Sequence, residues 1–240
     1  MTPVLEVVEL SAGYGGLPVL RDLSFRLDAG EVLALIGANG AGKTTALLTI
    51  SGLLRPLAGD VVFQGDSAVG VRPDRLARSG LVHVPDDRGL FPSLTVAEHL
   101  DLVRADHSAR ARVNEWFPAL VPLADRRVGL LSGGEQQMVA LAQALVRDPR
   151  VLMIDEMSLG LAPMVASSLL PVLRRVADES GCAVLIVEQH ASMALSAADQ
   201  AVVLAHGNVV AHDAADALEA NFAQVLDGYL GADGTSAEPG

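Results

Sequence analysis

The hydrophobic positions of this chain fall into two kinds of short run, one alternating with polar residues and one apolar throughout. The alternating kind occupies residues 4–10 and 19–27, on either side of the glycine-rich segment 13–16. A period of two is typical of strands with one buried face, and glycines between two such runs favour a turn. We therefore predict a pair of antiparallel strands near the N-terminus.

The second kind of run is apolar at every position. Three such runs cover residues 32–36, 151–154 and 183–187, and they are followed by Gly37, Asp155 and Glu188. Continuous apolar runs are typical of strands that are buried on both faces, as in a parallel sheet. Helical stretches lie between them, so the pattern predicts an α/β fold with a mainly parallel sheet. In such folds chemistry gathers where the strands end.

The middle of the chain has a different pattern. Residues 94–147 look helical, and Thr95 and Glu98 have the spacing of a capping box. Further along, one apolar stripe at helical spacing consists of Met138, Leu141, Ala142 and Leu145. We expect a helical sub-domain at about residues 90–150, inserted between two strands of the sheet.

The C-terminal part predicts a hairpin and then a tail. Residues 201–204 and 208–211 read as two strands on either side of His206 and Gly207. The last residues, 232–240, are small and polar, and we expect them to fray. The expected organisation is therefore one domain over residues 1–231 followed by a flexible tail.

Composition narrows the class of protein. The chain has 240 residues, of which 50% are hydrophobic and 19% charged, which excludes disorder for most of its length. No apolar run approaches the roughly 18 residues that a membrane-spanning helix needs. The N-terminus does not resemble a signal peptide, and the one cysteine, Cys182, permits no intrachain disulfide. These features favour a cytoplasmic chain.

Charge adds two observations. The net charge is −12, which argues against nucleic acid as the main partner because an acidic surface repels phosphate backbones. The 17 basic residues comprise 16 arginines and a single lysine, Lys43. That lysine lies in the first of three motifs that carry candidate chemistry.

The first motif is a phosphate-binding loop. Residues 37–44 match G-x-x-x-x-G-K-[ST], directly after a predicted strand and before a predicted helix over residues 45–51. Glycines let backbone N–H groups surround phosphate oxygens, Lys43 supplies a positive charge, and the Thr44 hydroxyl can bind Mg²⁺. A chance glycine turn is the alternative, and the flanking strand and helix argue against it. The candidate nucleotide-binding residues are Gly37, Asn39, Gly40, Ala41, Gly42, Lys43, Thr44 and Thr45.

The second motif ends the apolar run at 151–154. Asp155 can hold Mg²⁺ directly or through water, and the neighbouring Glu156 can polarise a water for attack on a γ-phosphate. The third motif is LSGGEQQ, in which Ser132, Gly133 and Gly134 precede a long helix. An anion site and an ordinary cap, with Ser132 bonded to Glu135, would use the same N–H groups. The residues alone leave these two readings open.

Together, GANGAGKTT, LSGGEQQ and VLMIDE resemble the nucleotide-binding subunit of ABC transporters, over about residues 4–231. Within that family, FPSLTVAEHL, LSGGEQQM, SLGLAP and VEQ are similar to the ATPase subunits of branched-chain amino acid importers, and to the SLGLAP-bearing member of the usual pair. The resemblance implies ATP and Mg²⁺ as cofactors and ATP hydrolysis as the activity. It also implies that Tyr14 stacks on adenine, although an ordinary turn tyrosine is the alternative reading.

The family's working unit implies partners. Two ATPase subunits close head to tail, so that each ATP lies between one phosphate loop and residues 132–135 of the other subunit. A heterodimer is implied by the family's pairs, and a homodimer stays open. Closure would drive a permease at the inner face of the membrane, supplied by an extracytoplasmic binding protein. The expected permease groove lies near residues 87–94; alternatively, Phe91 is a buried residue of a hairpin turn.

Four positions depart from the family pattern. Asp86 stands where most relatives have a glutamine that touches Mg²⁺ and the attacking water, although branched-chain importer subunits often have an acid there. Met157 replaces a proline, from which we expect a small effect. Ala162 replaces an aspartate in the loop that crosses to the partner. Gln189 lies opposite the family's switch histidine, and His190 could substitute only if the loop shifts.

Three other functions remain to be weighed against an amino acid importer. A urea or short-chain amide importer is the nearest, and SLGLAP and Glu135 favour amino acids over it. A nucleotide-gated regulatory module without useful turnover is favoured by Gln189 and opposed by Glu156. A DNA-repair or translation ATPase is disfavoured because the chain has one ATPase copy, no heptads and an acidic balance.

Overall fold

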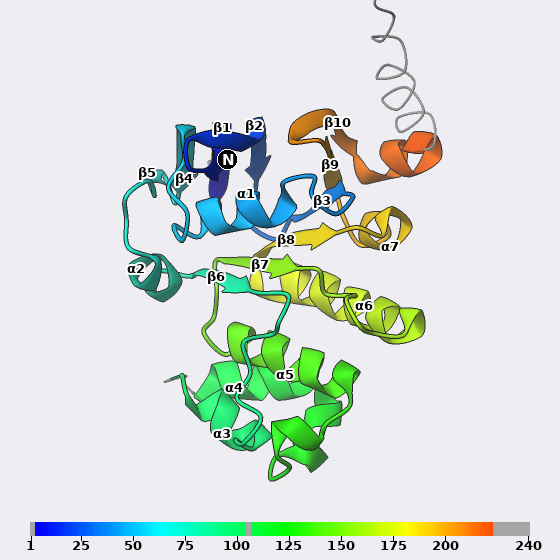
Figure 1. Ribbon diagram of the computed structural model, residues 1–240. Coiled ribbons are helices and arrows are strands. Elements are labelled where there is room, and N and C mark those ends of the chain that lie inside the picture. The colour runs from blue at the N-terminus through cyan, green and yellow to red at the C-terminus, as the bar shows by residue number, and fades with distance from the viewer. Residues whose placement is uncertain (1–2, 104–106, 223–240) are drawn as a thin grey trace, which may run out of the picture.

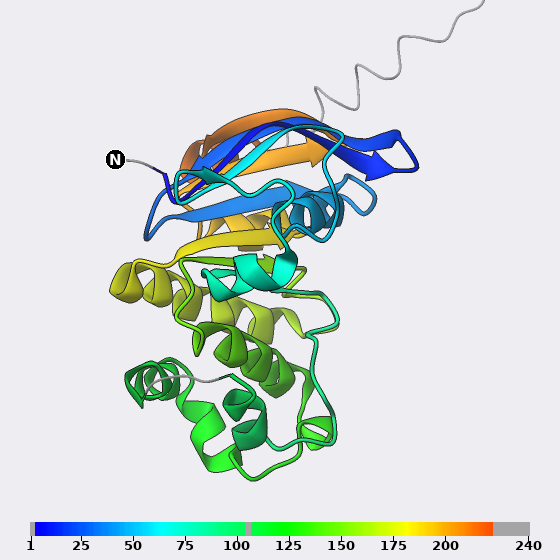
Figure 2. The same cartoon turned by 90° about the vertical axis from the view of Figure 1, so that its left-hand side faces the viewer.

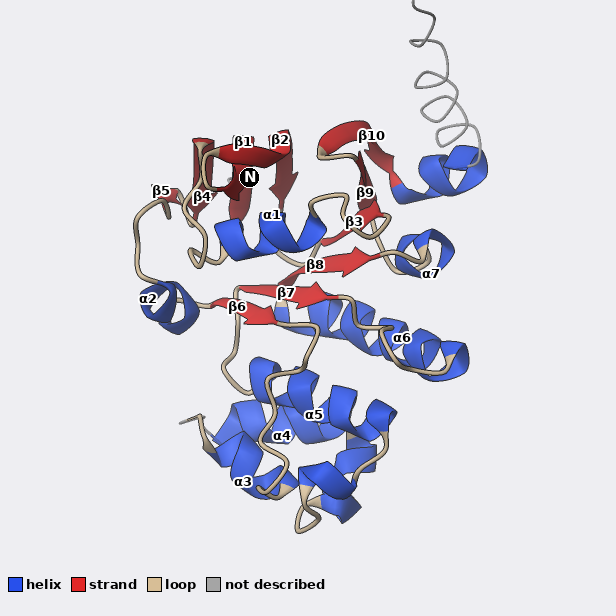
Figure 3. Ribbon diagram, viewed as in Figure 1, coloured by secondary structure: helices blue, strands red, loops and turns tan. Residues whose placement is uncertain are grey.

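The computed structural model describes residues 3–103 and 107–222, which form two sheets and a group of helices arranged in layers (Figures 1 and 2). An antiparallel sheet lies at one end, a mainly parallel sheet in the middle, and most helices at the other end (Figure 3). The expected boundary at residue 231 and the tail over 232–240 lie outside the described residues.

The mainly parallel sheet has the strand order β10-β9-β3-β8-β7-β6. Its members are β6 (Leu81–Val84), β7 (Val151–Asp155), β8 (Ala183–Glu188), β3 (Val32–Gly37), β9 (Gln200–Ala205) and β10 (Asn208–Ala214). Every residue of β3, β7 and β8 is buried, as their apolar runs predict. Only the terminal β9–β10 hairpin is antiparallel. The predicted α/β class is therefore confirmed.

The smaller sheet is antiparallel, with the order β2-β1-β4-β5. It consists of β1 (Leu5–Tyr14), β2 (Leu17–Leu27), β4 (Ala58–Phe63) and β5 (Asp66–Ser67). The turn between β1 and β2 is shorter than predicted, because Gly15 and Gly16 alone make it, with φ of 59° and 82°. Two positive φ values suit a tight hairpin turn, so Tyr14 belongs to the strand rather than to the turn.

One hydrophobic core lies between the two sheets, and a larger one lies on the far side of the parallel sheet. Helix α1 (Lys43–Ile50) packs in the first core, against residues from both sheets. In the second core, α6 (Pro163–Ser180) lies between the sheet and the helical layer (Figure 1). The shorter α2 (Pro73–Arg78) and α7 (Ala191–Leu195) flank the sheet.

The predicted helical insertion lies between β6 and β7. It contains α3 (Val96–Asp101), α4 (His107–Trp116), two short 3₁₀ helices (Pro118–Leu123 and Val128–Leu130) and α5 (Gly133–Leu145). The capping box of Thr95 and Glu98 is present. In the α5 stripe Leu141, Ala142 and Leu145 are buried and Met138 is half-buried against the same core. Among the described helices none is long and apolar enough to cross a bilayer.

Helix α6 begins without a side-chain cap. Its N-cap residue is Ala162, which has an extended backbone, and Pro163 follows at the first helical position. An aspartate at an N-cap accepts a hydrogen bond from a free N–H of the first turn and interacts favourably with the helix dipole. The aspartate that the family pattern has here would therefore also serve as a cap.

We expect Ala162→Asp to stabilise the isolated chain by about 1 kcal/mol, because it supplies the missing cap. Thermal unfolding should show a rise in Tm of about 2–4 °C. Ala111→Asp, at an exposed position inside α4, is the matched control and should give no rise. Equal effects of the two substitutions would show that added charge, not capping, is responsible.

Candidate nucleotide-binding site

The phosphate-loop segment connects the end of β3 to the start of α1, between the two sheets (Figure 1). Gly40 and Gly42 have φ of 81° and 102°, and Gly42 caps α1 without any side-chain hydrogen bond. A Cβ on Gly37 would lie 2.6 Å from the Leu204 carbonyl oxygen, so only glycine fits beside β9. The helix starts at Lys43, earlier than predicted, because this loop turns directly into it. Its uncapped N-terminus faces the loop and suits an anion.

Lys43 is the central cation of the site. It is only 4% exposed, and its Nζ donates to the carbonyl oxygens of Gly37 (2.8 Å) and Ala38 (3.1 Å). The same Nζ lies 3.3 Å from Oε1 of Glu156. A buried ammonium needs such partners, because burial of an unpaired charge is very costly. An incoming phosphate could take the place of the carboxylate as the partner of Lys43.

Asp155 ends β7 and is 2% exposed. Burial raises its pKa to about 6, against a hydrogen bond from the Thr44 side chain that lowers it; the charges of Glu156 and Asp86 raise it further, and Lys43 lowers it. Among the described residues, no hydrogen-bond partner reaches its Oδ1. A buried carboxylate oxygen without a partner, beside a threonine hydroxyl, fits a divalent cation or a water bound to one. The described residues contain no cluster of three or more histidine, cysteine or acidic side chains placed to hold a metal.

Glu156 has a strained backbone. Its φ is 43°, a left-handed conformation that costs a non-glycine residue about 1 kcal/mol. Its N–H donates to the Val187 carbonyl oxygen at 2.9 Å, which holds the strained turn against β8. The next residue, Met157, is completely buried in the larger core. Met157 therefore contributes a buried side chain to this core, in addition to the loss of proline's backbone constraint that the sequence indicates.

Gln189 and His190 face different surroundings. Gln189 lines a cavity of about 370 Å³ that it shares with loop residues 37–41. His190 is the N-cap of α7 and lines another cavity, with Ser158 and Leu161. The structure thus brings Gln189, and not His190, beside the phosphate-loop segment.

Asp86 and Tyr14 lie at the edges of the site. Asp86 is exposed on the loop after β6, and its charge reaches Asp155, whose pKa it helps to raise. Tyr14 is 53% exposed at the end of β1. The adjoining strand β2 lies close to the loop, since a Cβ on Gly42 would lie 3.3 Å from the Val19 carbonyl oxygen. An exposed ring at this end of the hairpin is available for stacking.

The SGGE segment lies in the helical layer, on the other side of the parallel sheet from α1 (Figure 1). Ser132 caps α5: its hydroxyl accepts from the Glu135 N–H (3.3 Å), while Glu135 Oε2 accepts from the Ser132 N–H (2.7 Å) and hydroxyl (2.8 Å). A Cβ on Gly134 would lie 2.5 Å from Cγ1 of Val165, so this glycine lets α5 approach α6. The cap reading holds in this chain, whose own phosphate loop is in another layer.

Glu188 and Arg88 are two further polar residues that join segments of the site, and the sequence motifs assign a role to neither. Glu188 is 1% exposed, and its two carboxylate oxygens accept from the Ser158 N–H (2.9 Å) and hydroxyl (2.7 Å). Burial raises the pKa of Glu188. It therefore ties the loop after Glu156 to the strand before Gln189. The sequence did offer a signal for Glu188, because this carboxylate directly follows the apolar run 183–187.

The second residue is Arg88, which belongs to none of the sequence motifs. Its side chain donates hydrogen bonds to α5 and to the loop after Glu156.

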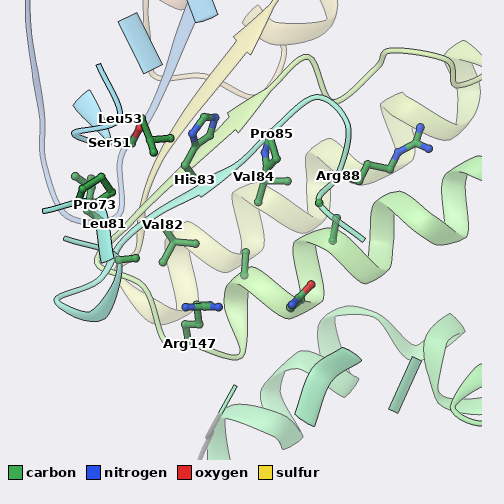
Figure 4. A pocket seen from close by; sticks show the side chains of 15 residues that line it. Ser51, Leu53, Pro73, Leu81, Val82, His83, Val84, Pro85, Arg88 and Arg147 are labelled. Carbon is green, nitrogen blue, oxygen red and sulfur yellow. The ribbon is translucent and has the colours of Figure 1, made fainter. Parts of the chain in front are cut away.

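A groove adjoins the start of segment 87–94, the segment at which we expect a permease to dock. Its volume is about 280 Å³, and it lies among β6, α2, α5 and the loop after β6, with Arg88 and Gly89 at its edge (Figure 4). Nearby, Phe91 is 58% exposed rather than buried, and its ring stacks on His99 at a centroid distance of 5.9 Å. The reading of Phe91 as a buried turn residue is therefore wrong.

The fold and the loop geometry define an α/β nucleotide-binding protein with a phosphate loop. The family model for ABC transporters matches residues 20–158. The high-affinity branched-chain amino acid transport ATP-binding protein BraG of Pseudomonas aeruginosa is 38% identical over 234 residues, which cover 95% of this chain and 100% of BraG. The chain therefore belongs to the ABC transporter family.

A second relative and a solved structure are also similar to this chain. The BraF protein of the same organism, also a branched-chain amino acid transport ATP-binding protein, is 27% identical over 95% of this chain and 98% of its own. The crystal structure of an ATP-binding cassette of an ABC transporter in its ADP conformation superposes with a TM-score of 0.85 at 23% identity, covering 96% of this chain and 100% of that one. This second likeness supports the fold.

The raised pKa of Asp155 predicts a pH-dependent penalty. The pKa of Asp155 is about 6 in the folded chain, against 3.8 for an ordinary aspartate. The folded state is therefore not destabilised by Asp155 below about pH 4, where the carboxyl is protonated, and it loses stability as the pH rises through 6 and the buried carboxyl ionises. Asp155→Asn should therefore stabilise the nucleotide-free chain at neutral pH, by at most about 3 kcal/mol. The difference from wild type should vanish near pH 4, as followed by thermal unfolding. A difference that does not change with pH would contradict this electrostatic account.

Proposed function

We propose that this chain is the ATP-hydrolysing subunit of an ABC importer for branched-chain or related hydrophobic amino acids. One observation carries the proposal of hydrolysis: Lys43, Asp155 and Glu156 converge at the strand ends beside the phosphate loop. Lys43 and Glu156 are 3.3 Å apart, and the carboxyl of Asp155 has a free buried oxygen. The substrate class is supported by the 38% identity to BraG.

The residues suited to hold Mg²⁺ are Thr44, Asp155 and Asp86. When bound, Mg²⁺ would supply positive charge to the β- and γ-phosphate oxygens. The Thr44 side chain already bonds to Asp155, and the negative charge of Asp86 reaches the same carboxyl. A divalent cation would offset both the burial and the repulsion from Glu156 and Asp86 that raise the pKa of Asp155.

The chain's own residues would share the work of hydrolysis. Lys43 binds the phosphates and in doing so releases Glu156 from its ion pair. Glu156, whose backbone N–H is bonded to the Val187 carbonyl oxygen, then accepts a proton from the attacking water. Gln189 can hydrogen-bond a γ-phosphate oxygen but cannot carry charge, so it positions without adding positive charge. ATP itself would stack on Tyr14 and lie along Gly37–Thr45 of the loop.

The complete site would need a second ATPase subunit. Ser132, Gly133, Gly134 and Glu135 lie in a different layer from the phosphate loop, which suits a head-to-tail pair in which they serve the partner's ATP. A heterodimer is favoured because Pseudomonas aeruginosa has two such proteins, BraG and BraF, and this chain is more similar to BraG. A homodimer is the alternative.

The groove of Figure 4 is the proposed seat of the permease. It lies between the sheet edge and the helical layer, and the exposed Phe91 lies on the loop that continues from it. The subunit would then work on the inner face of the membrane, with an extracytoplasmic binding protein acting through the permease. Nucleic acid has no role in this proposal.

A nucleotide-gated module without turnover is the second candidate. It is favoured by the neutral side chain of Gln189 beside the loop and by the ion pair that occupies Glu156. It would bind Mg-ATP and close without hydrolysis. Turnover measurements distinguish it from the leading proposal.

ATP turnover per subunit should rise with protein concentration, because each site needs two subunits. Glu156→Gln should lower the rate at least about 100-fold, since it removes the proton acceptor and keeps the shape. Glu219→Gln, at an exposed position of the last helical segment, is the matched control and should keep the wild-type rate. Mg-ATP binding without turnover, even with the partner subunit and permease present, would favour the nucleotide-gated module.

The substrate class makes a separate prediction. In vesicles containing the complete transporter, leucine-loaded binding protein should stimulate ATP hydrolysis by this subunit and drive leucine uptake. Urea and acetamide, offered in the same vesicles with their own binding protein, should not stimulate it. Stimulation by urea and not by leucine would move the assignment to the amide importers.

A further inference from the structure

Arg88 joins three segments that the sequence keeps far apart. Its Nε donates to Oε1 of Gln137 at 2.9 Å, its Nη1 to Oε1 of Gln136 at 3.2 Å, and its Nη2 to the carbonyl oxygen of Leu159 at 3.3 Å. These partners are 48 to 71 residues further along the chain. The backbone of Arg88 is left-handed, with φ of 68°, so the loop is bent to aim this side chain.

Each partner segment belongs to a different part of the site. Gln136 and Gln137 lie in α5 just after the SGGE segment, and Gln137 is buried. Gln136 also donates to the carbonyl oxygens of Val128 and Leu131, so it holds the chain that leads into α5. Leu159 lies three residues after Glu156. Arg88 thus contacts the first turns of α5 and the loop that follows Glu156.

The position of Arg88 requires a side chain that donates to three separate acceptors, which suits a guanidinium better than an ammonium group. Arginine presents five N–H donors in a rigid plane and can reach three acceptors at fixed angles. Lysine offers one point of attachment on a flexible stem. Arg88 is one of the residues that line the groove, and in Figure 4 its side chain extends away from the other labelled residues. Its side chain therefore connects the groove wall to α5 and the loop after Glu156.

We propose that Arg88 is a positioning residue that couples the two ATP sites of the working pair. The inference rests on the proposed function, in which Asp86 and Glu156 act on the chain's own ATP and residues 132–135 act on the partner's. Arg88 follows Asp86 by two residues and bonds next to both other segments. A structural change at one ATP site would then alter the position of the segment at the other site, because the Arg88 guanidinium is bonded to both. A permease segment bound in the groove would contact the same loop.

The helical layer has a second attachment at its far side, which supplies a reporter. Trp116 of α4, the only tryptophan in the chain, donates from Nε1 to Oε2 of Glu179 in α6 at 2.8 Å. The ring is 5% exposed. Rotation of the helical layer against α6 would change this hydrogen bond and the burial of the ring. Its fluorescence therefore reports the orientation of the layer without any engineered label.

The first experiment follows amide hydrogen exchange at residues 132–137 in the full chain without nucleotide. We compare wild type with Arg88→Ala, Arg88→Lys and the control Arg147→Ala, an exposed arginine at the same groove. Loss of the guanidinium bonds should speed exchange at these amides about tenfold in Arg88→Ala. Arg88→Lys, which keeps charge and folding, should recover only part of the protection, and Arg147→Ala should behave as wild type. Exchange within about twofold of wild type in both Arg88 variants would overturn the proposal.

The second experiment separates coupling from mere stability. In the working pair, Arg88→Lys should lower kcat and reduce the Hill coefficient for ATP, while the Kd of a single chain for a non-hydrolysable ATP analogue stays unchanged. Adding the analogue should shift Trp116 emission in the wild-type pair, and this shift should be smaller in the variant. A lower affinity of the single chain with unchanged cooperativity would assign Arg88 to nucleotide binding and overturn the coupling.

The two proposals fail in different ways. If the wild-type chain binds no Mg-ATP, the proposed function is wrong, whatever Arg88 does to the exchange at α5. If wild type binds and hydrolyses ATP cooperatively and the Arg88 variants match it in exchange, cooperativity and Trp116 emission, only the inference about Arg88 is wrong.

Discussion

The site is organised around one buried ammonium group. Lys43 is 4% exposed, and a charge in that position is tolerated only because two loop carbonyls and the Glu156 carboxylate surround it. The same loop contains Gly40 and Gly42, which take left-handed conformations that favour glycine. The shape of the loop, the start of α1 and the place of Glu156 therefore all depend on how this ammonium group is neutralised.

The negative charge around this lysine exceeds its positive charge. Burial raises the pKa of Asp155, and the negative charges of Glu156 and Asp86 raise it further. Such a site is electrostatically incomplete by itself. A divalent cation bound together with phosphate oxygens would supply the missing positive charge, and the unpartnered Oδ1 of Asp155 could bind that cation or a water on it.

Polar ties, in addition to the hydrophobic cores, connect the segments of the site. One core packs the two sheets together, and the other packs the parallel sheet against the helices. In addition, Glu188 joins the loop after Glu156 to β8, and Arg88 joins that loop to α5. Hydrogen bonds of this kind are directional and can exchange partners, whereas close-packed cores resist deformation. The polar ties therefore fix how the loop after Glu156 lies relative to β8 and α5.

The sequence by itself determined the phosphate loop, the buried strands and the capping box at Thr95, because each depends on residues within a few positions of one another. It also indicated the family, since three local motifs occur in the right order. Tertiary structure decided what depends on distant segments: Gln189 faces the loop while His190 does not, Gly134 is required by Val165, and Met157 is buried. Arg88 is the clearest case. Its three acceptors come from segments 48 to 71 residues away, and no local pattern encodes which segments will pack together.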